Sequence, residues 1–337
     1  MNNINIVNEE GKPNFGIWNG QIQKVNFLNY NKTKTSKFFK YFREKRWQYI
    51  GLYGEKVIIG LAIIHTGYLG NVFWYIFDRE TASFIEKDKK IPFGIGIRVD
   101  RNVAIGISSY RTGEEYITIN NDITMGFRRI SAKLKHKNKN INIEVSLHDN
   151  FKDIEPLQVV TPTGEGNFTF THKAICFPVQ GFVSIDDRAI SFNSEKDFSV
   201  IDYTFGFPDY STLWNWCSLA GKSIDGVSIG VNLVAPIFHN DFNENVIWIN
   251  GVIIKTDYAI FKFTENTMKP WEISTVDGKV ELIFMPLGKR QQDIDLFIIS
   301  SRFQQPYGIF SGTIRDNNRI YTLRDVPGVV EYHEAHW

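Results

Sequence analysis

The chain has 337 residues, which exceeds one ordinary domain and suits two domains of about 150–170 residues each. Its 38 basic and 37 acidic residues leave a formal net charge of +1, so it lacks the positive field typical of nucleic-acid-binding proteins. The two cysteines, Cys176 and Cys217, have no metal or redox spacing, and we expect buried free thiols in a reducing cytoplasm.

The N-terminal residues show neither the charge nor the hydropathy of an export signal. No basic region precedes an apolar run there, and the longest apolar stretches, residues 57–64 and 72–77, have the length of strands. A bilayer needs roughly 20 apolar residues in one helix. We therefore expect a cytoplasmic protein without a membrane span, and nothing in the sequence specifies its oligomeric state.

The first half of the chain is dominated by two-residue alternation, which predicts antiparallel strands. One helix is expected over residues 34–45, where Phe38 and Phe42 share a face. The basic residues 133–139 form a predicted hairpin loop, in preference to a nucleic-acid patch. The predicted strands of this half cover residues 47–53, 56–65, 70–78, 95–99, 103–108, 127–135 and 141–148.

Residues 153–171 are rich in proline and glycine, which indicates turns. We place a domain junction near residue 170, giving domains 1–170 and 171–337. Each half has about the number of strands found in a β-barrel or β-sandwich, so an all-β, antiparallel fold is expected. The predicted strands of the second half cover residues 175–185, 189–192, 199–205, 212–219, 228–233, 246–254, 258–263, 272–275, 280–285, 307–314, 320–326 and 329–337.

Polar side chains interrupt the apolar strands of the second half. Each would cost about 1–3 kcal/mol if it were buried without a hydrogen bond, so their number predicts a wet or functional interior. Asp202 is a candidate acid in a strand of apolar neighbours, or an acceptor that fixes the corner at Tyr203. The remaining polar candidates are Asn215, Glu244, Glu331 and His333.

Tryptophans accompany these polar residues. Trp214 and Trp216 fall on one face of a predicted strand, with Asn215 on the other, and could line a ligand site or an ordinary aromatic core. Glu244 and Trp248 share a face at the mouth of another strand, where barrels gather ligand contacts.

The C-terminal residues Glu331, His333 and His336 form an ExHxxH sequence. This spacing differs from standard zinc signatures, and we prefer hydrogen bonding within the barrel to a metal site. No nucleophile or phosphate-binding motif occurs, so no cofactor is expected. In the first half, His65 in the HTGYLG sequence is a further candidate ligand-binding residue or a turn residue.

Several long and unusual sequence motifs of this chain resemble those of the bacterial family known as domain of unknown function 2804. The motifs extend over nearly the whole chain, but the resemblance implies no activity. They are GxWxG at 16–20, WxYxGL at 47–52, HTGYxG at 65–70, DYTFG at 202–206, WNW at 214–216, NENVIW at 243–248 and GVVEYHEAHW at 328–337.

The second half is also remotely similar to lipocalin-like two-domain proteins, such as carotenoid hydratases, AttH-type proteins and fungal Diels–Alderases. The similarity rests on residues 179–185, on the DYTFG sequence and on the Trp-rich strand. It implies two lipocalin-like barrels or sandwiches, with Asp202 as a proton donor. Tyr203 stands where the hydratases have a histidine, and an Asp–Tyr pair is the corresponding expectation here.

We expect a hydrophobic or aromatic small molecule to bind in a barrel or interdomain pocket, and we expect no nucleic-acid partner. A cofactor-independent hydratase, isomerase or cyclase would use Asp202 as the acid with Tyr203 in support, while the tryptophans would stabilise a developing cation. A non-catalytic carrier of a hydrophobic metabolite is the alternative, and a structural or interaction protein ranks below both.

Overall fold

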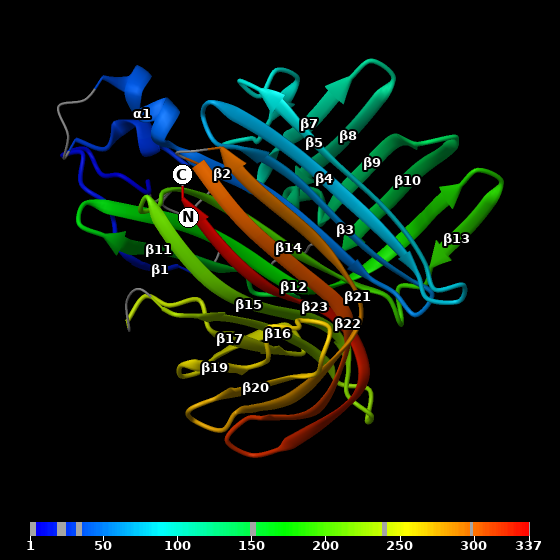
Figure 1. Cartoon of the computed structure of the whole chain (residues 1–337). Helices are drawn as coiled ribbons and strands as arrows, with labels where there is room; N and C mark the ends of the chain where they lie inside the picture. Colours follow the sequence, from blue (N-terminus) through cyan, green and yellow to red (C-terminus); the bar gives the residue numbers. More distant parts are fainter. Residues whose placement is uncertain are drawn as a thin grey trace. The chain divides into compact units, whose positions relative to one another are not determined.

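The computed structural model describes residues 5–18, 25–31, 36–148, 153–237, 241–296 and 299–336. The chain forms two compact units, Met1–Pro208 and Asp209–Trp337, and each is described by itself (Figure 1). Every strand pairing among the described residues is antiparallel. The predicted all-β, antiparallel fold is confirmed.

The first unit is built on a 14-stranded sheet with the path β5-β4-β3-β2-β14-β12-β10-β9-β8-β7-β6; β1 and β11 extend it beside β12, and β13 pairs with β12. Its strands are β1 (Gly16–Ile17), β2 (Lys45–Tyr53), β3 (Val57–His65), β4 (Leu69–Asp78), β5 (Ser83–Pro92), β6 (Ile97–Arg98), β7 (Ile105–Thr112), β8 (Glu115–Asp122), β9 (Phe127–His136), β10 (Lys139–His148), β11 (Leu157–Gly164), β12 (Asn167–Ile185), β13 (Arg188–Phe192) and β14 (Phe198–Phe207). Its helical segments are η1 (Phe27–Asn29), α1 (Lys37–Arg43) and η2 (Ile123–Met125).

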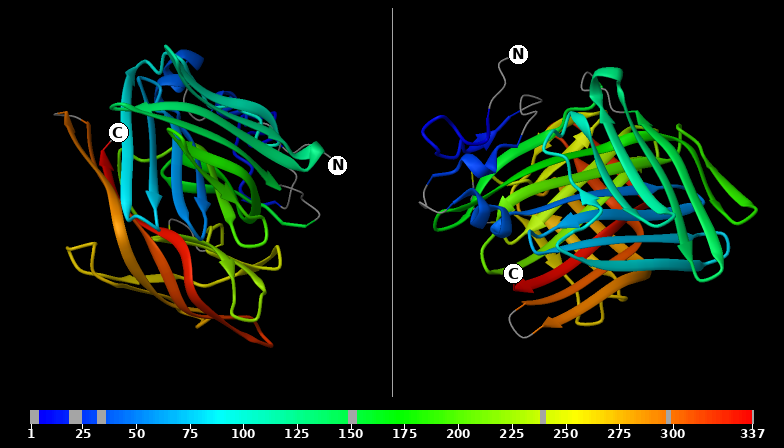
Figure 2. Two further views of the ribbon diagram at one scale, coloured as in Figure 1. Left: turned by 90° about the vertical axis from the view of Figure 1, so that its right-hand side faces the viewer. Right: turned by 90° about the horizontal axis from the view of Figure 1, so that it is seen from above.

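The sequence pattern accounts for where these strands lie in the sheet. β3 is apolar along nearly its whole length and is buried on both faces, whereas β9 and β10 alternate between buried and exposed residues. The sheet curls so strongly that β3 also contacts β6 and β7, although these strands are distant along the sheet path (Figure 2). The inner face of the curl is therefore enclosed by strands from opposite walls.

The long strand β12 changes partners near its middle. Residues 168–178 pair with β14, while residues 179–185 pair with β10 and residues 181–185 pair with β13 on the other side. The register shifts between Ile175 and Phe177, and Cys176 there has a positive φ of 74°. Such a bulge bends a strand and so lets one long strand serve two parts of a curled sheet.

The second unit is a nine-stranded sheet in the order β18-β17-β16-β15-β23-β22-β21-β20-β19. Its concave apolar core gathers Cys217, Val231, Trp271, Phe310 and other buried residues, and β16 also contacts β19. The strands are β15 (Ser211–Lys222), β16 (Ser228–Ala235), β17 (Val246–Ile249), β18 (Val252–Lys255), β19 (Ala259–Lys262), β20 (Trp271–Thr275), β21 (Val280–Leu296), β22 (Ile299–Arg315) and β23 (Ile320–His336).

The two compact units divide after Pro208, whereas the predicted junction near residue 170 falls inside β12. The prolines and glycines that suggested a linker belong instead to the β11–β12 hairpin, where Gly166 adopts a positive φ of 76°. Proline and glycine mark turns within a domain as readily as linkers between domains. The first unit thus keeps Asp202 and Tyr203 on its last strand.

Other differences concern polar strands and the helix. Strands β5 and β8 carry too many charged or polar residues for the alternation to stand out, and both were absent from the prediction. The helix is shorter than predicted, Lys37–Arg43, and residues 32–35 lie outside the described ranges. The shared face of Phe38 and Phe42 is confirmed, with ring centroids 4.9 Å apart. Both cysteines are buried and free, as expected.

Candidate functional site

Asp202 lies on β14 within a group of polar partners. Its carboxylate lies 3.6 Å from the Lys173 ammonium on β12, and accepts from Trp47 Nε1 at 3.4 Å and from Thr204 Oγ1 at 3.1 Å. The residue is only 8% exposed. This predicted acid is therefore held by an ammonium group and two further donors.

Tyr203 does not support Asp202, because adjacent residues of a strand point to opposite faces. The Tyr203 hydroxyl donates to the main-chain oxygen of Asp100 at 2.5 Å, on the inner face of the unit. Burial raises the pKa of this phenol well above its ordinary value. The predicted Asp–Tyr pair is thus two separate groups in this fold.

In the second unit, the predicted tryptophans share one face of the sheet. Trp214 and Trp216 lie on the face of β15 opposite the apolar core, and register places Trp248 of β17 on that same face. Asn215 lies on the other face, as predicted. Trp216 Nε1 donates to Asn232 Oδ1 at 2.8 Å, and Asn232 Nδ2 donates to the main-chain oxygen of Glu244 at 2.7 Å.

Glu331 and His333 of β23 join this aromatic face. The Glu331 carboxylate accepts from Trp214 Nε1 at 2.7 Å and from Gln305 Nε2 at 3.0 Å. The His333 ring lies edge-on to Trp214, with centroids 4.2 Å apart, and its Nε2 lies 2.8 Å from Ser301 Oγ. Burial, followed by the Arg290 charge, lowers the His333 pKa to about 3, so this imidazole is neutral.

The prediction of internal hydrogen bonding for the ExHxxH sequence fits these contacts. His336 also has hydroxyl neighbours, with Ser300 Oγ 2.8 Å from its Nδ1. Across the described parts of the chain, no group of three His, Cys, Asp or Glu residues is arranged to hold a metal ion. The same parts contain no helix with the length and hydropathy of a membrane span.

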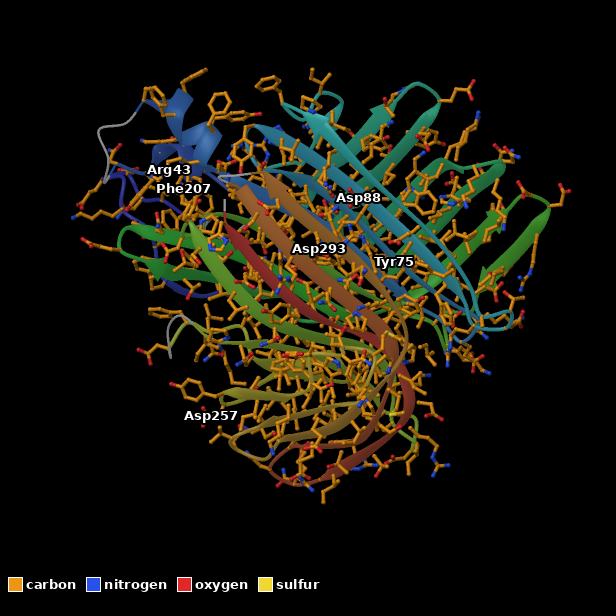
Figure 3. The ribbon with its side chains drawn as sticks, in the orientation of Figure 1. Arg43, Tyr75, Asp88, Phe207, Asp257 and Asp293 are labelled. Atoms are coloured by element: carbon orange, nitrogen blue, oxygen red, sulfur yellow. The ribbon has the colours of Figure 1, made fainter. Side chains whose placement is uncertain are left out.

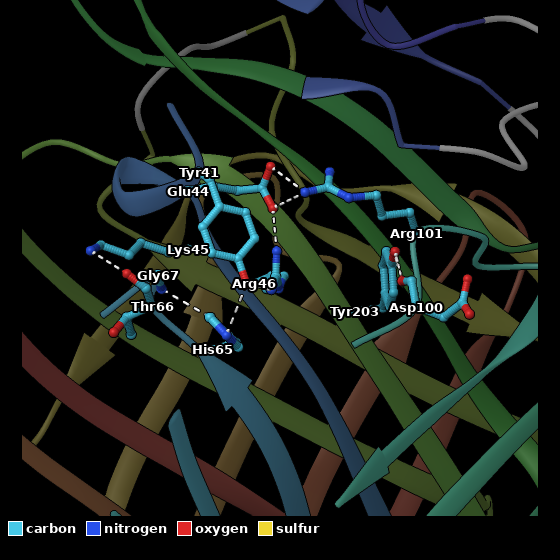
Figure 4. A network of polar contacts seen from close by, with 10 residues as sticks. All are labelled: Tyr41, Glu44, Lys45, Arg46, His65, Thr66, Gly67, Asp100, Arg101 and Tyr203. Carbon is cyan, nitrogen blue, oxygen red and sulfur yellow. Dashed lines mark hydrogen bonds and ion pairs between the residues drawn. The ribbon is translucent and has the colours of Figure 1, made fainter. Parts of the chain in front are cut away.

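His65 belongs to a polar network that the sequence did not reveal (Figure 4). Gly67 N–H donates to His65 Nδ1 at 3.0 Å, and the Tyr41 hydroxyl oxygen lies 3.3 Å from His65 Nε2. Burial, followed by the charges of Arg46, Lys45 and Arg101, lowers the His65 pKa to about 4. The neutral ring accepts at Nδ1, so its proton is on Nε2 and is shared between the Tyr41 oxygen and the main-chain oxygen of Phe93.

Tyr41 receives a second donor from Arg46, whose Nη2 lies 3.0 Å from the phenol oxygen. An oxygen that accepts from both an imidazole N–H and a guanidinium is well supported when it carries negative charge. Its own O–H is then directed away from both donors. Tyr41 as a residue is half-buried, and its oxygen is fixed by these two contacts.

Glu44 fixes the two arginines of the network. Its fully buried carboxylate accepts from Arg46 Nη1 at 2.9 Å and from Arg101 Nη2 at 2.6 and 2.9 Å. Two N–H groups, Arg46 Nε and Arg101 Nη1, are buried and have no hydrogen-bond acceptor within the described ranges. They are available to an oxygen atom of a bound molecule.

Large apolar side chains are exposed beside this network. Phe38 and Phe39 of α1 are 65% and 60% exposed, and Phe93 and Ile95 of the turn after β5 are 66% and 74% exposed. Both segments touch the 65–67 turn, because a Cβ on Gly67 would meet the Phe42 main chain and one on Gly94 would meet the His65 ring, each at 2.5 Å. Exposed apolar groups of this kind mark interaction sites.

The C-terminal end of α1 also contacts the end of β14. The Arg43 guanidinium lies over the Phe207 ring, 5.8 Å from its centroid (Figure 3). Lys45 Nζ, at the start of β2, donates to the Thr66 oxygen at 2.9 Å and lies 4.2 Å from the Tyr68 ring centroid. Helix, strand and turn thus position Tyr41, Arg46 and His65 together.

The network was missed because its members are distant in sequence and individually ordinary. Only His65 was singled out, from the HTGYLG sequence. A pattern of helix residues shows that Phe38 and Phe42 share a face, but it cannot show that Tyr41 meets a strand end. The charged pair Glu44 and Arg46 at the start of β2 was the one available signal, since charges rarely begin a buried strand.

Two solved structures resemble the chain in fold. Kievitone hydratase from Nectria haematococca has a TM-score of 0.53 and 11% sequence identity, with 86% of this chain and 88% of that chain covered. A candidate AttH protein from Nitrosomonas europaea has a TM-score of 0.47 and 12% identity, with 86% and 92% covered. No curated protein matches the chain.

A family model covers the chain from end to end. It matches residues 1–337 and is described as "Domain of unknown function (DUF2804)". The resemblance to this family that the sequence motifs indicated is thereby confirmed. The chain belongs to the DUF2804 family.

Proposed function

We propose that this protein binds a small apolar molecule beside Tyr41 and transfers a proton to it, in a cofactor-independent reaction of the hydratase type. The observation that carries the proposal is the phenol oxygen of Tyr41, which accepts from Arg46 and from neutral His65. Such a proton transfer requires an acid that is held in position by its hydrogen-bond partners.

The proposed reaction adds water across a carbon–carbon double bond. Tyr41 gives its proton to one carbon, and the phenolate is stabilised by the N–H groups of Arg46 and His65. A water molecule forms a C–O bond at the other carbon and returns one proton to Tyr41. The net change is the addition of one H₂O, and the protein is regenerated without a redox partner.

Three further observations favour this location over Asp202. The Asp202 carboxylate is engaged by Lys173, Trp47 and Thr204, whereas the Tyr41 O–H is directed away from its two donors. Exposed Phe38 and Phe93 supply apolar surface for a ligand. Buried N–H groups of Arg46 and Arg101 can hold a ligand oxygen.

Fold similarity adds a reason to consider hydration. Kievitone hydratase, one of the two structures described above, is named for a reaction that adds water. At 11% identity the likeness concerns the fold alone, so the proposed chemistry rests on the Tyr41 network.

The proposal is tested by finding the ligand and following water into it. Native mass spectrometry of protein purified from its own host should reveal a co-purifying small molecule. Incubation of that molecule, or of its dehydrated form, with the protein in H₂¹⁸O should yield a product that carries ¹⁸O. A bound molecule that never acquires ¹⁸O would support a carrier and contradict the hydratase proposal.

A further inference from the structure

A second polar group lies deeper in the first unit and has no part in the proton transfer proposed above. It consists of Gln48, Asn121 and Arg128, which are all fully buried. Gln48 Nε2 donates to Asn121 Oδ1 at 3.2 Å, and Arg128 Nη1 donates to the same oxygen. A second Arg128 nitrogen, Nη2, lies 3.4 Å from His172 Nε2.

These residues come from opposite walls of the curled sheet. Asn121 of β8 is the register partner of Arg128 of β9, whereas Gln48 belongs to β2. Along the sheet path, β2 and β8 are separated by β14, β12, β10 and β9. The Gln48–Asn121 hydrogen bond therefore crosses the interior of the unit.

Two atoms of this group have no hydrogen-bond partner among the described residues: Gln48 Oε1 and Asn121 Nδ2. Rotating the Asn121 amide would not give these two atoms hydrogen-bond partners. Its oxygen already accepts from two N–H donors, so rotation would turn an NH₂ group against both of them. One acceptor and one donor are left in the interior, and buried polar atoms of this kind are costly without partners.

Apolar side chains continue from each polar residue. Ile50, Ile119 and Ile130 lie two positions from Gln48, Asn121 and Arg128 on the same strand faces, and each is fully buried. The polar group is therefore bordered by an apolar wall on each of its three strands. Polar atoms at the border of an apolar interior fix the orientation of a mainly apolar ligand.

We propose that Gln48 and Asn121 form a subsite for the hydroxyl group of an apolar alcohol or phenol. The ligand O–H donates to Gln48 Oε1, and its oxygen accepts from Asn121 Nδ2. A hydroxyl group combines one donor with an acceptor, which is the complement of the two unused atoms. An ether lacks the donor, and a hydrocarbon lacks both functions.

This subsite deepens the proposed function and rests on it in one respect, namely that a small molecule enters the first unit. Gln48 and Arg46 lie two residues apart on one face of β2, a separation of about 7 Å. A ligand of modest size can therefore reach from the subsite to the Tyr41 network. The subsite is tested by binding alone, so its failure is distinct from a failure of the Tyr41 chemistry.

The test compares phenol with toluene, which has nearly the same shape and no hydroxyl group. Dissociation constants for the full-length protein are measured by NMR titration. A purely apolar site binds toluene more tightly, because toluene is less well hydrated. The proposed subsite reverses this order, and we expect phenol to bind at least about tenfold more tightly than toluene. Anisole, which accepts but cannot donate, should bind more weakly than phenol.

Substitution locates the preference. Gln48→Met keeps the side-chain length and removes both amide atoms, so the order should change to toluene over phenol. Gln305→Met alters a buried glutamine of the second unit and should leave the phenol preference unchanged. Phenol that binds no better than toluene to the wild-type protein overturns the proposal, whether or not Gln48→Met folds. A Gln48→Met protein that retains the phenol preference overturns it as well.

Discussion

His65 Nε2 and the hydroxyl oxygen of Tyr41 lie 3.3 Å apart, and this contact joins the end of β3 to helix α1. The imidazole is buried and neutral, and its other nitrogen is already occupied by the Gly67 amide. Tyr41 therefore faces a donor whose tautomer is fixed. The phenol of Tyr41 is held in position as a proton donor.

Neutral His65 makes the stability of the protein depend on pH. The unfolded chain protonates His65 near its ordinary pKa of about 6.5, and the folded protein does so only near pH 4. The unfolded state therefore binds more protons between these values. The unfolding free energy should fall by up to about 1.4 kcal/mol per pH unit as the pH is lowered through this window.

The His65 contribution can be isolated with His65→Gln. Urea denaturation at pH 7, 6 and 5 should show that the stability advantage of the wild-type protein over this variant shrinks as the pH falls. His333, whose pKa is also lowered, contributes equally to both proteins and cancels. His148→Gln, at an exposed histidine, is the matched control and should leave the pH profile unchanged. A wild-type advantage that is constant from pH 7 to 5 would contradict the buried, neutral assignment.

Gly94 maintains the position of His65. Its φ is +64°, and a Cβ at this position would lie 2.5 Å from His65 Cδ2. Gly113 has a similar φ of +55° and no atom within 4 Å of such a Cβ. Gly113→Ala should cost about 1–2 kcal/mol from backbone strain alone. Gly94→Ala should cost clearly more, as measured by urea denaturation, because it also displaces the imidazole. Equal losses in the two variants would show that His65 moves aside freely.

Much of the fold could be predicted from the sequence, because β3, β4 and β15 carry strong apolar runs or clear alternation. The shared face of Trp214 and Trp216 follows from the two-residue period alone. Strands β5 and β8 could not, since their charged and polar residues mask the alternation. The division after Pro208 could not either, since β14 belongs to the first unit through its pairing with β2, which is remote in the chain. Among the site residues, Asp202 and Tyr203 were predicted as a pair from the resemblance to the Asp–His sequence of the hydratases, although adjacent residues of a strand point to opposite faces. Tyr41 and Arg46 meet His65 only through the packing of α1 against the 65–67 turn.

The hydrogen bond from Trp214 to Glu331 should couple β15 to β23 energetically. A double-mutant cycle with Trp214→Phe and Glu331→Leu should give a coupling of about 1–3 kcal/mol in urea denaturation, because the bond is short and its acceptor is only 7% exposed. The exposed ion pair of Arg315 and Glu281 in the same unit is the control. Its cycle should give less than about 1 kcal/mol. A Trp214–Glu331 coupling no larger than that of the control would contradict this interpretation.

The two thiols should be inert in the folded protein. Cys217 is fully buried, and burial raises its thiol pKa well above the ordinary value, while Cys176 is 3% exposed at the bend of β12. Ellman's reagent should therefore find no reactive thiol under native conditions and two after unfolding in urea. Rapid reaction of either thiol in the folded protein would contradict the burial described for the two units.

The Tyr41 phenol donates the proton in the proposed reaction, so removing its hydroxyl group tests the reaction most directly. Tyr41→Phe removes the one oxygen atom that accepts from Arg46 and His65, so we expect a loss of about 1–3 kcal/mol in the unfolding free energy while the fold is kept. With the molecule identified by native mass spectrometry, the rate of ¹⁸O incorporation from H₂¹⁸O should fall by about 10²–10⁴-fold, the usual contribution of a general acid. Tyr258→Phe, at an exposed tyrosine of the second unit, should retain the wild-type rate. If Tyr41→Phe incorporates ¹⁸O as fast as the wild-type protein, Tyr41 is not the acid and the account of this site is wrong.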